Sequence, residues 1–245
     1  MNREFHECGV ISGLYRYPVK SMRGESLSEA HLDWHGLDGD RRYAFVRQGA
    51  NSGFPWFTGR DLSQLLLYTP RFLQPQDLKQ SSIVVATPTG HDLPLEGPEL
   101  AEELQQACGQ AIFLFKLGCG AYDSQVLSLM STASVAALGE SAGMNLGSSR
   151  FRQNILIETR DGRPFQEEEW LDRVLAFGPD LDGPRIRLNR RIIRCVMINI
   201  DPHTAERDAR VLKTVAQSRD NGAGIYASVE RPGTIRVGDP VSVLL

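Results

Sequence analysis

Three short segments of the sequence concentrate side chains that bind anions. Lys20-Ser21 follows Tyr17-Pro18-Val19, Arg41-Arg42 precedes a short apolar run, and Arg150-Phe151-Arg152-Gln153-Asn154 lies far downstream. Arginine presents a rigid fork of donors that matches phosphate or carboxylate, and lysine adds a point charge. In a chain of formal net charge -3, these clusters could converge on an anionic ligand such as a nucleotide-like cofactor. The alternative is that they are solvated ends of strands.

Cys195 is the cysteine with the most distinctive surroundings. It lies in the run Arg190-Arg191-Ile192-Ile193-Arg194-Cys195-Val196-Met197-Ile198. Nearby positive charge favours the thiolate, which is a soft ligand that molybdenum and late transition metals accept. Along a strand, however, alternation would send Arg194 and Cys195 to opposite faces. From spacing alone, a cysteine packed in a buried apolar strand is therefore favoured over a metal ligand.

Several common motifs are absent from the sequence. No H-E-x-x-H, G-x-G-x-x-G or G-x-x-x-x-G-K pattern occurs, which removes the simplest zinc-protease, dinucleotide and P-loop interpretations. The four cysteines, Cys8, Cys108, Cys119 and Cys195, form no C-x-x-C pair. This argues against a structural zinc, an iron–sulfur cluster or a disulfide scaffold and favours a reducing cytoplasm.

Composition restricts the class of protein. The chain has 245 residues, of which 41% are hydrophobic and 23% charged, as in globular chains with a substantial core. With 27 Lys+Arg against 30 Asp+Glu, a general nucleic-acid or acidic-membrane partner is not expected. No apolar run is long enough to cross a bilayer, and the N-terminus lacks the apolar core of a secretory signal. We therefore expect a cytoplasmic protein without a membrane span.

The elements that must position these side chains are mostly short strands. Strands are predicted at 10–17, 27–32, 43–46, 83–87, 112–117, 127–130, 154–158, 192–200, 224–229 and 235–244. Helices are predicted at 99–108, 133–140 and 205–217, the second with an N-cap at Ser131-Thr132. Gly118-Cys119-Gly120 marks a change of pattern and predicts two units, residues 1–118 and 119–245. The expected fold is mainly β with a few helices, barrel-like and in two lobes.

A set of motifs in a fixed order spans nearly the whole chain. Its members are Tyr17-Pro18-Val19-Lys20-Ser21, Gly36-Leu37-Asp38-Gly39-Asp40-Arg41-Arg42-Tyr43, Phe151-Arg152-Gln153-Asn154-Ile155, Arg194-Cys195 with Asp201-Pro202-His203-Thr204, and Gly224-Ile225-Tyr226 with the segment 232–241. Together they resemble the MOSC family, named for the C-terminal domain of molybdenum cofactor sulfurases. The resemblance is to its two-lobed branch, which contains the mitochondrial amidoxime-reducing component. It implies an N-terminal β-barrel lobe followed by a C-terminal MOSC β-barrel.

The resemblance also implies a cofactor and its ligands. Molybdenum held by a molybdopterin would take one protein thiolate, and Cys195 occupies that position, which makes it the expected metal ligand and catalytic residue. Residues that would hold the cofactor are Lys20, Ser21 and Arg42 from the N-terminal lobe, Arg152, Asn154 and Arg194 from the C-terminal lobe, and Asp123-Ser124 near the pterin. The clusters of arginine would thus share one phosphate.

The implied activity is the two-electron reduction of small N-hydroxylated compounds, N–OH to N–H, by an oxidoreductase. Electrons would come from a separate donor protein of ferredoxin or flavoprotein type. Two alternatives stay open: a non-catalytic carrier of the cofactor or sulfur-transfer accessory, and a β-barrel binding module for a flavin or an oligonucleotide.

The sequence departs from the family pattern in two places. The T-A-R-Q-x-P stretch expected after the first lobe's strand is here only partly matched by Trp56-Phe57-Thr58-Gly59-Arg60-Asp61-Leu62. The pyridoxal-phosphate-binding desulfurase module of the family's eukaryotic fusions is not expected in this chain, so pyridoxal phosphate binding attaches only to the family.

Overall fold

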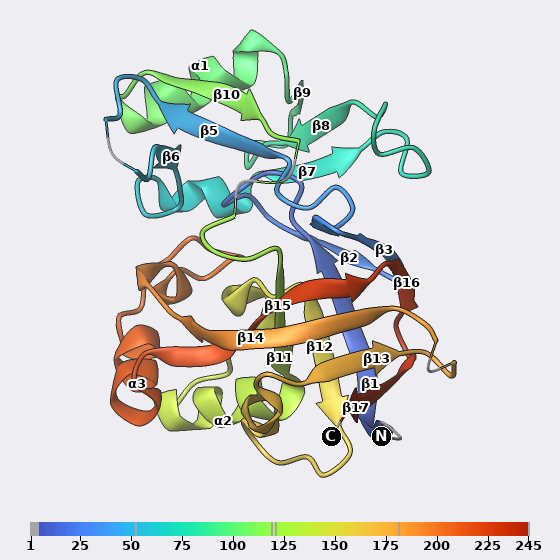
Figure 1. The fold of residues 1–245 in the computed structure, drawn as a ribbon. Coiled ribbons are helices and arrows are strands. Elements are labelled where there is room, and N and C mark those ends of the chain that lie inside the picture. Colours follow the sequence, from blue (N-terminus) through green and yellow to red (C-terminus); the bar gives the residue numbers. More distant parts are fainter. Residues whose placement is uncertain (1–4, 52, 119, 121, 181, 245) are drawn as a thin grey trace.

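The computed structural model describes residues 5–51, 53–118, 120, 122–180 and 182–244. The described chain forms two lobes stacked end to end, a barrel below and a smaller lobe above it (Figure 1). The start of β1 (Phe5–Arg16) and the end of β17 (Pro240–Leu244) lie side by side at the base of the barrel (Figure 1). Mainly β architecture with three α-helices is thus confirmed.

The lower lobe is a closed seven-stranded β-barrel. In order around the ring its strands are β12 (Ile155–Thr159), β11 (Leu127–Ser131), β15 (Gly222–Arg231), β14 (Arg185–Ile193), β13 (Val174–Phe177), β17 (Pro240–Leu244) and β1 (Phe5–Arg16). The ring closes because β1 pairs with both β17 and β12, and β2 (Glu25–Leu27) adds to its far end. All neighbours are antiparallel except β11 and β12, which are parallel.

β1 closes the barrel because its sequence lets it bend. Its register shifts between Glu7 and Gly9 and again between Ile11 and Gly13, and such bulges curve a strand. A Cβ atom at Gly9 would lie only 2.3 Å from the carbonyl oxygen of Glu158. Glycine at this position therefore permits the close approach of β12 that closure requires.

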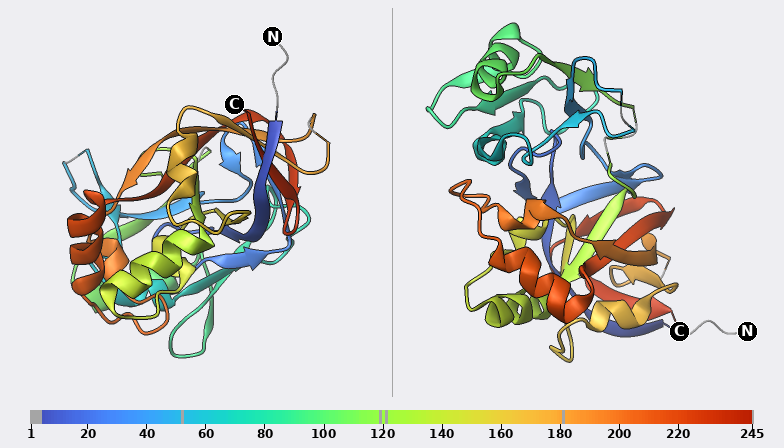
Figure 2. Two further views of the ribbon diagram at one scale, coloured as in Figure 1. Left: turned by 90° about the horizontal axis from the view of Figure 1, so that it is seen from below. Right: turned by 90° about the vertical axis from the view of Figure 1, so that its left-hand side faces the viewer.

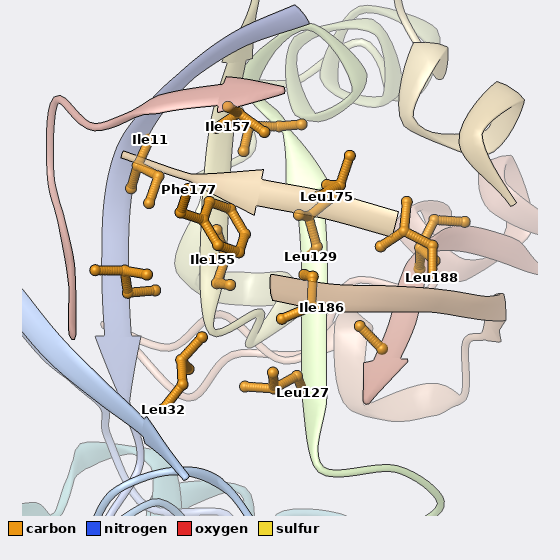
Figure 3. Close-up of a cluster of buried hydrophobic side chains, with 14 of the residues drawn as sticks. Ile11, Leu32, Leu127, Leu129, Ile155, Ile157, Leu175, Phe177, Ile186 and Leu188 are labelled. Atoms are coloured by element: carbon orange, nitrogen blue, oxygen red, sulfur yellow. The ribbon is translucent and has the colours of Figure 1, made fainter. Parts of the chain in front are cut away.

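The barrel interior is filled by apolar side chains from every strand of the ring. Ile11, Leu129, Ile155, Phe177 and Ile186 are all fully buried there and interdigitate across the barrel (Figure 3). The barrel is therefore a packed core and leaves its ligand-binding chemistry to its ends.

Two helices cover one side of the barrel and pack against each other (Figure 2). They are α2 (Thr132–Ala142) and α3 (Arg210–Arg219), and they share a second core with the 3₁₀ turns η2 (Ser148–Phe151) and η4 (Val196–Asn199). The predicted N-cap of α2 is confirmed, since Ser131 Oγ accepts a hydrogen bond from Ser134 N. The buried Glu167 of η3 (Gln166–Trp170) accepts from Ser131 N and Ser134 Oγ and fixes this corner.

The upper lobe has its own apolar core between two small antiparallel sheets and a helix. One sheet has the order β10 (Ile112–Lys116), β5 (Tyr43–Arg47), β6 (Trp56–Phe57), and the other has β7 (Thr69–Phe72), β8 (Ile83–Ala86), β9 (Asp92–Pro94). Helix α1 (Pro98–Cys108) begins with Pro98 and ends at Gly109 in the left-handed conformation, as the sequence predicts. The turn η1 (Ser63–Leu67) buries Leu65 and Leu66 below it.

A third small sheet pairs an early segment of the chain with a late one. Its strands are β16 (Gly233–Arg236), β3 (Glu29–Asp33) and β4 (Gly36–Leu37). Together with β1, this sheet places much of the first 37 residues beside the C-terminal strands (Figure 1). The division at 118/119 stays a prediction, and its Cys119 lies outside the described residues.

Three predicted elements differ from the structure, one of them the helix predicted at 205–217, which begins only at Arg210. The strand predicted at 192–200 is wrong after Ile193, where pairing with β15 stops at Gly222 and the chain turns into η4. The last segment forms three strands instead of two, because a turn at 236–239 separates β16 from β17. Strand β13 and the first half of β14 have no counterpart in the prediction. No helix in the described part of the chain has the length and apolar character needed to span a bilayer.

Candidate functional site

A cavity opens between the two lobes and is lined by both of them. Residues of the upper lobe and the turns below it that line it are Lys20, Ser21, Arg41, Phe54, Thr58 and Arg60. From the linker and the barrel come Tyr122, Asp123, Gln125, Ser128, Arg150, Phe151, Arg152, Asn154, Ile192, Ile193, Arg194, Cys195, Met197, Ile198 and Tyr226. Of the nine site residues predicted from the sequence, the cavity therefore unites all except Arg42 and Ser124, counting Cys195 once.

The lining is strongly cationic although the whole chain is slightly acidic. Its basic members are Lys20, Arg41, Arg60, Arg150, Arg152 and Arg194. Among the described residues that line the cavity, Asp123 is the one carboxylate. A concave surface with this charge attracts and holds an anion.

Arg152 is held in place by neutral groups. It ends η2 in the left-handed conformation, at φ 54°, and its Nη1 donates to the carbonyl of Met22 over 2.8 Å. Its guanidinium lies over the ring of Tyr17, 4.3 Å from the centroid. The buried Nη2 finds no hydrogen-bond partner among the described residues. Burial lowers the pKa of Arg152 to about 10, so the group stays charged at neutral pH.

Arg194 has the same arrangement on a neighbouring element. Its Nε donates to the carbonyl of Ala223 over 2.7 Å and its Nη1 to that of Phe151 over 2.6 Å. Its Nη2 is also buried and finds no partner in the described chain, and burial lowers the pKa of Arg194 to about 10. Gly224, at φ +76°, makes room for it, since a Cβ there would lie 3.0 Å from Arg194 Nη2. Two buried guanidinium groups thus keep one donor each for a ligand.

Lys20 and Ser21 enter the cavity from the turn after β1. The backbone of Lys20 is fixed by a hydrogen bond from its N to the carbonyl of Tyr43, and Ser21 adopts φ 65°. The buried Lys20 ammonium forms a hydrogen-bonded ion pair with Asp123. Burial lowers the pKa of Lys20, and the Asp123 carboxylate opposes that shift.

Asn154 lines the cavity, but its side chain mainly holds neighbouring elements together. Its Oδ1 accepts hydrogen bonds from the N and Oγ of Ser128, and its Nδ2 donates to the carbonyl of Tyr15. The same Oδ1 lies 3.5 Å from Nη1 of Arg41. Asn154 therefore joins β1, β11 and β12 directly beneath the cavity.

Arg41 lines the cavity, as the cationic cluster Arg41-Arg42 suggested, but the family resemblance had selected its neighbour Arg42 as the residue that holds the cofactor. Arg41 pairs with the fully buried Asp40, donates to the carbonyl of Arg152 over 3.0 Å and lies over the ring of Tyr17. The neighbouring Arg42, which the family resemblance selected, donates to the carbonyl of Gly118 and lines a separate cavity. The positive φ of Arg41, +50°, is what separates the directions of the two side chains. The turn signal Gly39-Asp40 was the available hint.

Ser124 also lies away from this cavity. Its Oγ accepts a hydrogen bond from Arg190, an arginine on the outer part of β14. Its neighbour Asp123 is the part of the predicted Asp-Ser pair that lines the site.

Cys195 is exposed, so the interpretation as a buried strand cysteine is wrong. Strand β14 ends at Ile193, and Cys195 precedes η4, where its carbonyl accepts from Ile198 N. The alternation argument fails because it applies only within a strand. As a result Arg194 and Cys195 both line the same cavity.

The other described cysteines lie in ordinary packing positions. Cys8 is buried in the barrel core, and burial raises its pKa to about 12, so it is held as a thiol. Cys108 is half-buried at the end of α1. Within the described residues, no group of three or more His, Cys, Asp or Glu side chains is placed to hold a metal ion.

Two short patterns that elsewhere mark catalytic sites have structural roles here. Residues 139–143 read G-x-S-x-G, but Ser141 lies in the last turn of α2 and donates to the carbonyl of Ala137. A nucleophile elbow instead needs a strand-to-helix turn. His31 and His35 have H-x-x-x-H spacing but lie on a strand and in the turn after it, not on one helix face.

The residues present fit a molybdopterin-type cofactor. Such a group brings a phosphate, which suits the two buried Nη2 donors of Arg152 and Arg194 that lack partners in the described chain. It also brings a soft metal, which suits the exposed thiol of Cys195 in the same cavity. The fit therefore rests on two kinds of group, the guanidinium donors for the phosphate and the thiol for the metal.

The structure thus defines a two-lobed β protein, a closed β-barrel joined to a smaller β lobe, with a cationic cavity between them that contains a thiol. The sequence model of the MOSC domain matches residues 117–242, and that of the MOSC N-terminal beta barrel domain matches residues 8–112. The chain belongs to the MOSC family.

Curated relatives match over nearly the full chain at low identity. The human mitochondrial amidoxime-reducing component 1 is 24% identical over 99% of this chain and 85% of its own length. The bovine mitochondrial amidoxime reducing component 2 is 25% identical over 98% of this chain and 84% of its own. A molybdenum cofactor sulfurase from Anopheles gambiae is 39% identical over 33% of this chain and 10% of its own. The family relationship therefore concerns proteins of molybdenum cofactor chemistry.

A solved structure supports the fold. The YuaD protein from Bacillus subtilis superposes with a TM-score of 0.54 at 13% identity, over 98% of both chains. At that identity the likeness concerns the fold alone.

Proposed function

We propose that this chain binds the molybdenum cofactor and reduces small N-hydroxylated compounds, N–OH to N–H, with electrons from a separate ferredoxin- or flavoprotein-type donor. The observation that carries the proposal is the exposed thiol of Cys195 in one cavity with the unpartnered, buried Nη2 atoms of Arg152 and Arg194. The amidoxime-reducing components among its relatives support the choice of substrate class. The free thiols of the described cysteines suit a cytoplasmic location.

Three side chains would hold the cofactor. Arg152 and Arg194 would bind its phosphate with charge-assisted hydrogen bonds, and the thiolate of Cys195 would ligate the metal. When bound, the cofactor supplies two-electron chemistry with transfer of the substrate oxygen. The rigid attachment of both arginines to backbone carbonyls means that little reorganisation accompanies binding.

The chain itself would manage protons and orientation. Reduction of N–OH to N–H and water consumes two electrons and two protons, so the cavity needs a proton-holding group. Lys20 lines the cavity and holds a proton at Nζ against Asp123, with a pKa lowered by burial. A lowered pKa brings an ammonium closer to the range in which it can donate. Asp123, half-exposed, would reload it from solvent.

The first test is the metal and pterin content of protein from a cofactor-producing host. Wild type should contain molybdenum and a pterin, Cys195→Ser should lose most of the metal, and Cys108→Ser should match wild type. Loaded wild type with a chemical reductant should then convert benzamidoxime to benzamidine. Metal-free wild type, or loaded wild type that leaves benzamidoxime untouched, contradicts the proposal at its first or second step.

A cofactor carrier or sulfur-transfer accessory is the second candidate, and the exposure of Cys195 favours it, because sulfur transfer needs an accessible thiol. The local likeness to a molybdenum cofactor sulfurase points in the same direction. Under this function, Cys195→Ser in the cell would lower the activity of other molybdoenzymes. Unchanged activity of those enzymes rules it out.

A further inference from the structure

Apolar side chains gather at the open end of the cavity, on both sides of Cys195. Ile193 is 67% exposed and Val196 is 42% exposed, and they lie two residues before and one residue after the thiol. Ile193 and Met197 line the cavity from the barrel, and Phe54 lines it from the upper lobe. We name the cavity-lining residues Phe54, Ile193 and Met197 the apolar lip.

The two lobes meet at the apolar lip. A Cβ at Gly59 of the upper lobe would lie 3.0 Å from Cε of Met197, so Met197 reaches across to the opposite lobe. Arg207 of the barrel lobe makes a second connection to this part of the upper lobe, because its Nη2 donates to the carbonyls of Gly59 and Arg60. The opening beside Cys195 is therefore bordered by side chains of both lobes in a fixed relation.

Some buried and exposed residues of the lining differ in kind, although the exposed Arg60 also places a charge beside Phe54. Arg152 and Arg194 are buried and cationic, whereas Ile193 presents most of an aliphatic side chain to water. Single exposed apolar residues are common on proteins, but apolar groups clustered at the rim of a cavity mark a binding surface. The aliphatic part of this rim suits an apolar ligand group, because burying charge against aliphatic carbon is unfavourable.

We propose that the apolar lip binds the non-reacting part of the substrate, an alkyl or aryl group, and that Ile193 determines the selectivity for it. The N-hydroxylated end would then face Cys195 while the apolar end lies on Ile193 and Met197. The identity of the reacting end depends on the proposed function. The preference for an apolar alkyl or aryl group does not depend on the proposed function, because it depends only on the apolar lip.

The first experiment uses the thiol of Cys195 as a reporter and requires no cofactor. N-alkylmaleimides from methyl to hexyl are reacted with the cofactor-free protein, and labelling at Cys195 is followed by peptide mass spectrometry. Full burial of a methylene corresponds to about a fourfold change in affinity, so a one-sided lip should give roughly twofold per methylene. We expect the hexyl reagent to react at least about tenfold faster than the methyl reagent.

Ile193→Ser should reduce that ratio well below the wild-type value and toward the value for a free cysteine peptide, because Phe54 and Met197 remain. Val237→Ser is the matched control, since Val237 is also exposed and apolar but lies outside the cavity lining, and it should keep the wild-type ratio. A wild-type ratio equal to that of the peptide, or an Ile193→Ser ratio equal to wild type, overturns the inference.

The second experiment separates this inference from the proposed function. Loaded wild type and Ile193→Ser are compared on alkyl amidoximes of increasing chain length. A kcat/KM that rises with chain length in wild type and is flat in Ile193→Ser supports both. Turnover without chain-length dependence overturns the lip and leaves the proposed function intact. A maleimide preference without any turnover of amidoximes leaves the lip intact and overturns the proposed function.

Discussion

Two pairs of cations in the cavity, one on the barrel wall and one on the opposite wall, are held in different ways; Arg150, also on the barrel wall, is paired with Asp201. On the barrel side, Arg152 and Arg194 are fixed by backbone carbonyls, which are neutral, so their full charge faces the cavity. On the side of the upper lobe and its linkers, Lys20 is paired with Asp123 and Arg41 with Asp40. The barrel wall is therefore built to bind an anion. On the opposite wall, Lys20 and Arg41 are placed to position groups and hold a proton, and Arg60 is the cation there without a carboxylate partner in the described chain.

The largest effect expected from this difference is on cofactor retention. Arg152→Met or Arg194→Met removes a charged hydrogen-bond donor, which costs about 1.5–3 kcal/mol, or roughly tenfold to hundredfold in affinity. Arg187→Met is the control, because Arg187 is exposed and pairs with Glu230 on the barrel exterior. The measurement is molybdenum and pterin per protein after dialysis. Retention equal to that of Arg187→Met would mean that the barrel wall does not carry the binding.

The rigidity of the barrel wall can be tested at Gly224. Gly224→Ala forces a side chain into φ +76° and toward the carbonyl oxygen of Leu129, 2.9 Å from the new Cβ. We expect the free energy of unfolding to fall by about 2–3 kcal/mol. Gly49→Ala, at φ +73° with nothing within 4 Å, should lose only about 1 kcal/mol. Urea unfolding of the two variants measures both losses. Equal losses would show that the backbone of Leu129 leaves room for a side chain at position 224.

The opposite wall should tolerate a similar change better. Arg41→Met removes a cation already neutralised by Asp40, so cofactor retention should fall by less than about tenfold. Its larger consequence should be for stability, because Asp40 would be left buried without a counter-charge and with only its hydrogen bond from Tyr17 N. The double substitution Asp40→Asn, Arg41→Met should recover part of that stability in urea unfolding. A retention loss as large as that of Arg152→Met would erase the distinction between the walls.

The smallest effect is a pH dependence from Lys20. Burial holds its pKa in the folded protein below the ordinary value of 10.5, so the unfolded chain binds more protons between the two values. The contribution of Lys20 to stability is therefore lowest below its folded pKa and rises with pH up to 10.5. Unfolding free energies measured from pH 7 to 10.5 should rise more in wild type than in Lys20→Met. Parallel curves would contradict the lowered pKa.

Local patterns were sufficient for most of the regular elements. The apolar run before Pro18 predicts β1, Gly109 predicts the end of α1, and Ser131 predicts the start of α2, because each signal acts within a few residues. The end of β14 was beyond such reasoning. It depends on where its partner β15 runs out at Gly222, and that pairing joins segments distant in sequence.

The site shows the same limit. The ordered motifs indicate which segments converge, and most of the residues they select do line one cavity. The choice between Arg41 and Arg42 depends on a left-handed turn that is fixed by contacts of Arg41 with Tyr17 and Asp40. The direction of Cys195 depends on the end of a strand. Both are properties of tertiary contacts, which a single sequence does not encode locally.

The position of β1 between β12 and β17 has a consequence for synthesis on the ribosome. Among the strands of the barrel, β1 is made first, and its two lateral partners lie at residues 155–159 and 240–244, so the barrel cannot close until those residues are available. The upper lobe, whose core draws on residues 19–114, is complete long before then. Co-translational folding should therefore begin in the upper lobe, while β1 stays without its last barrel partner until β17 has been made.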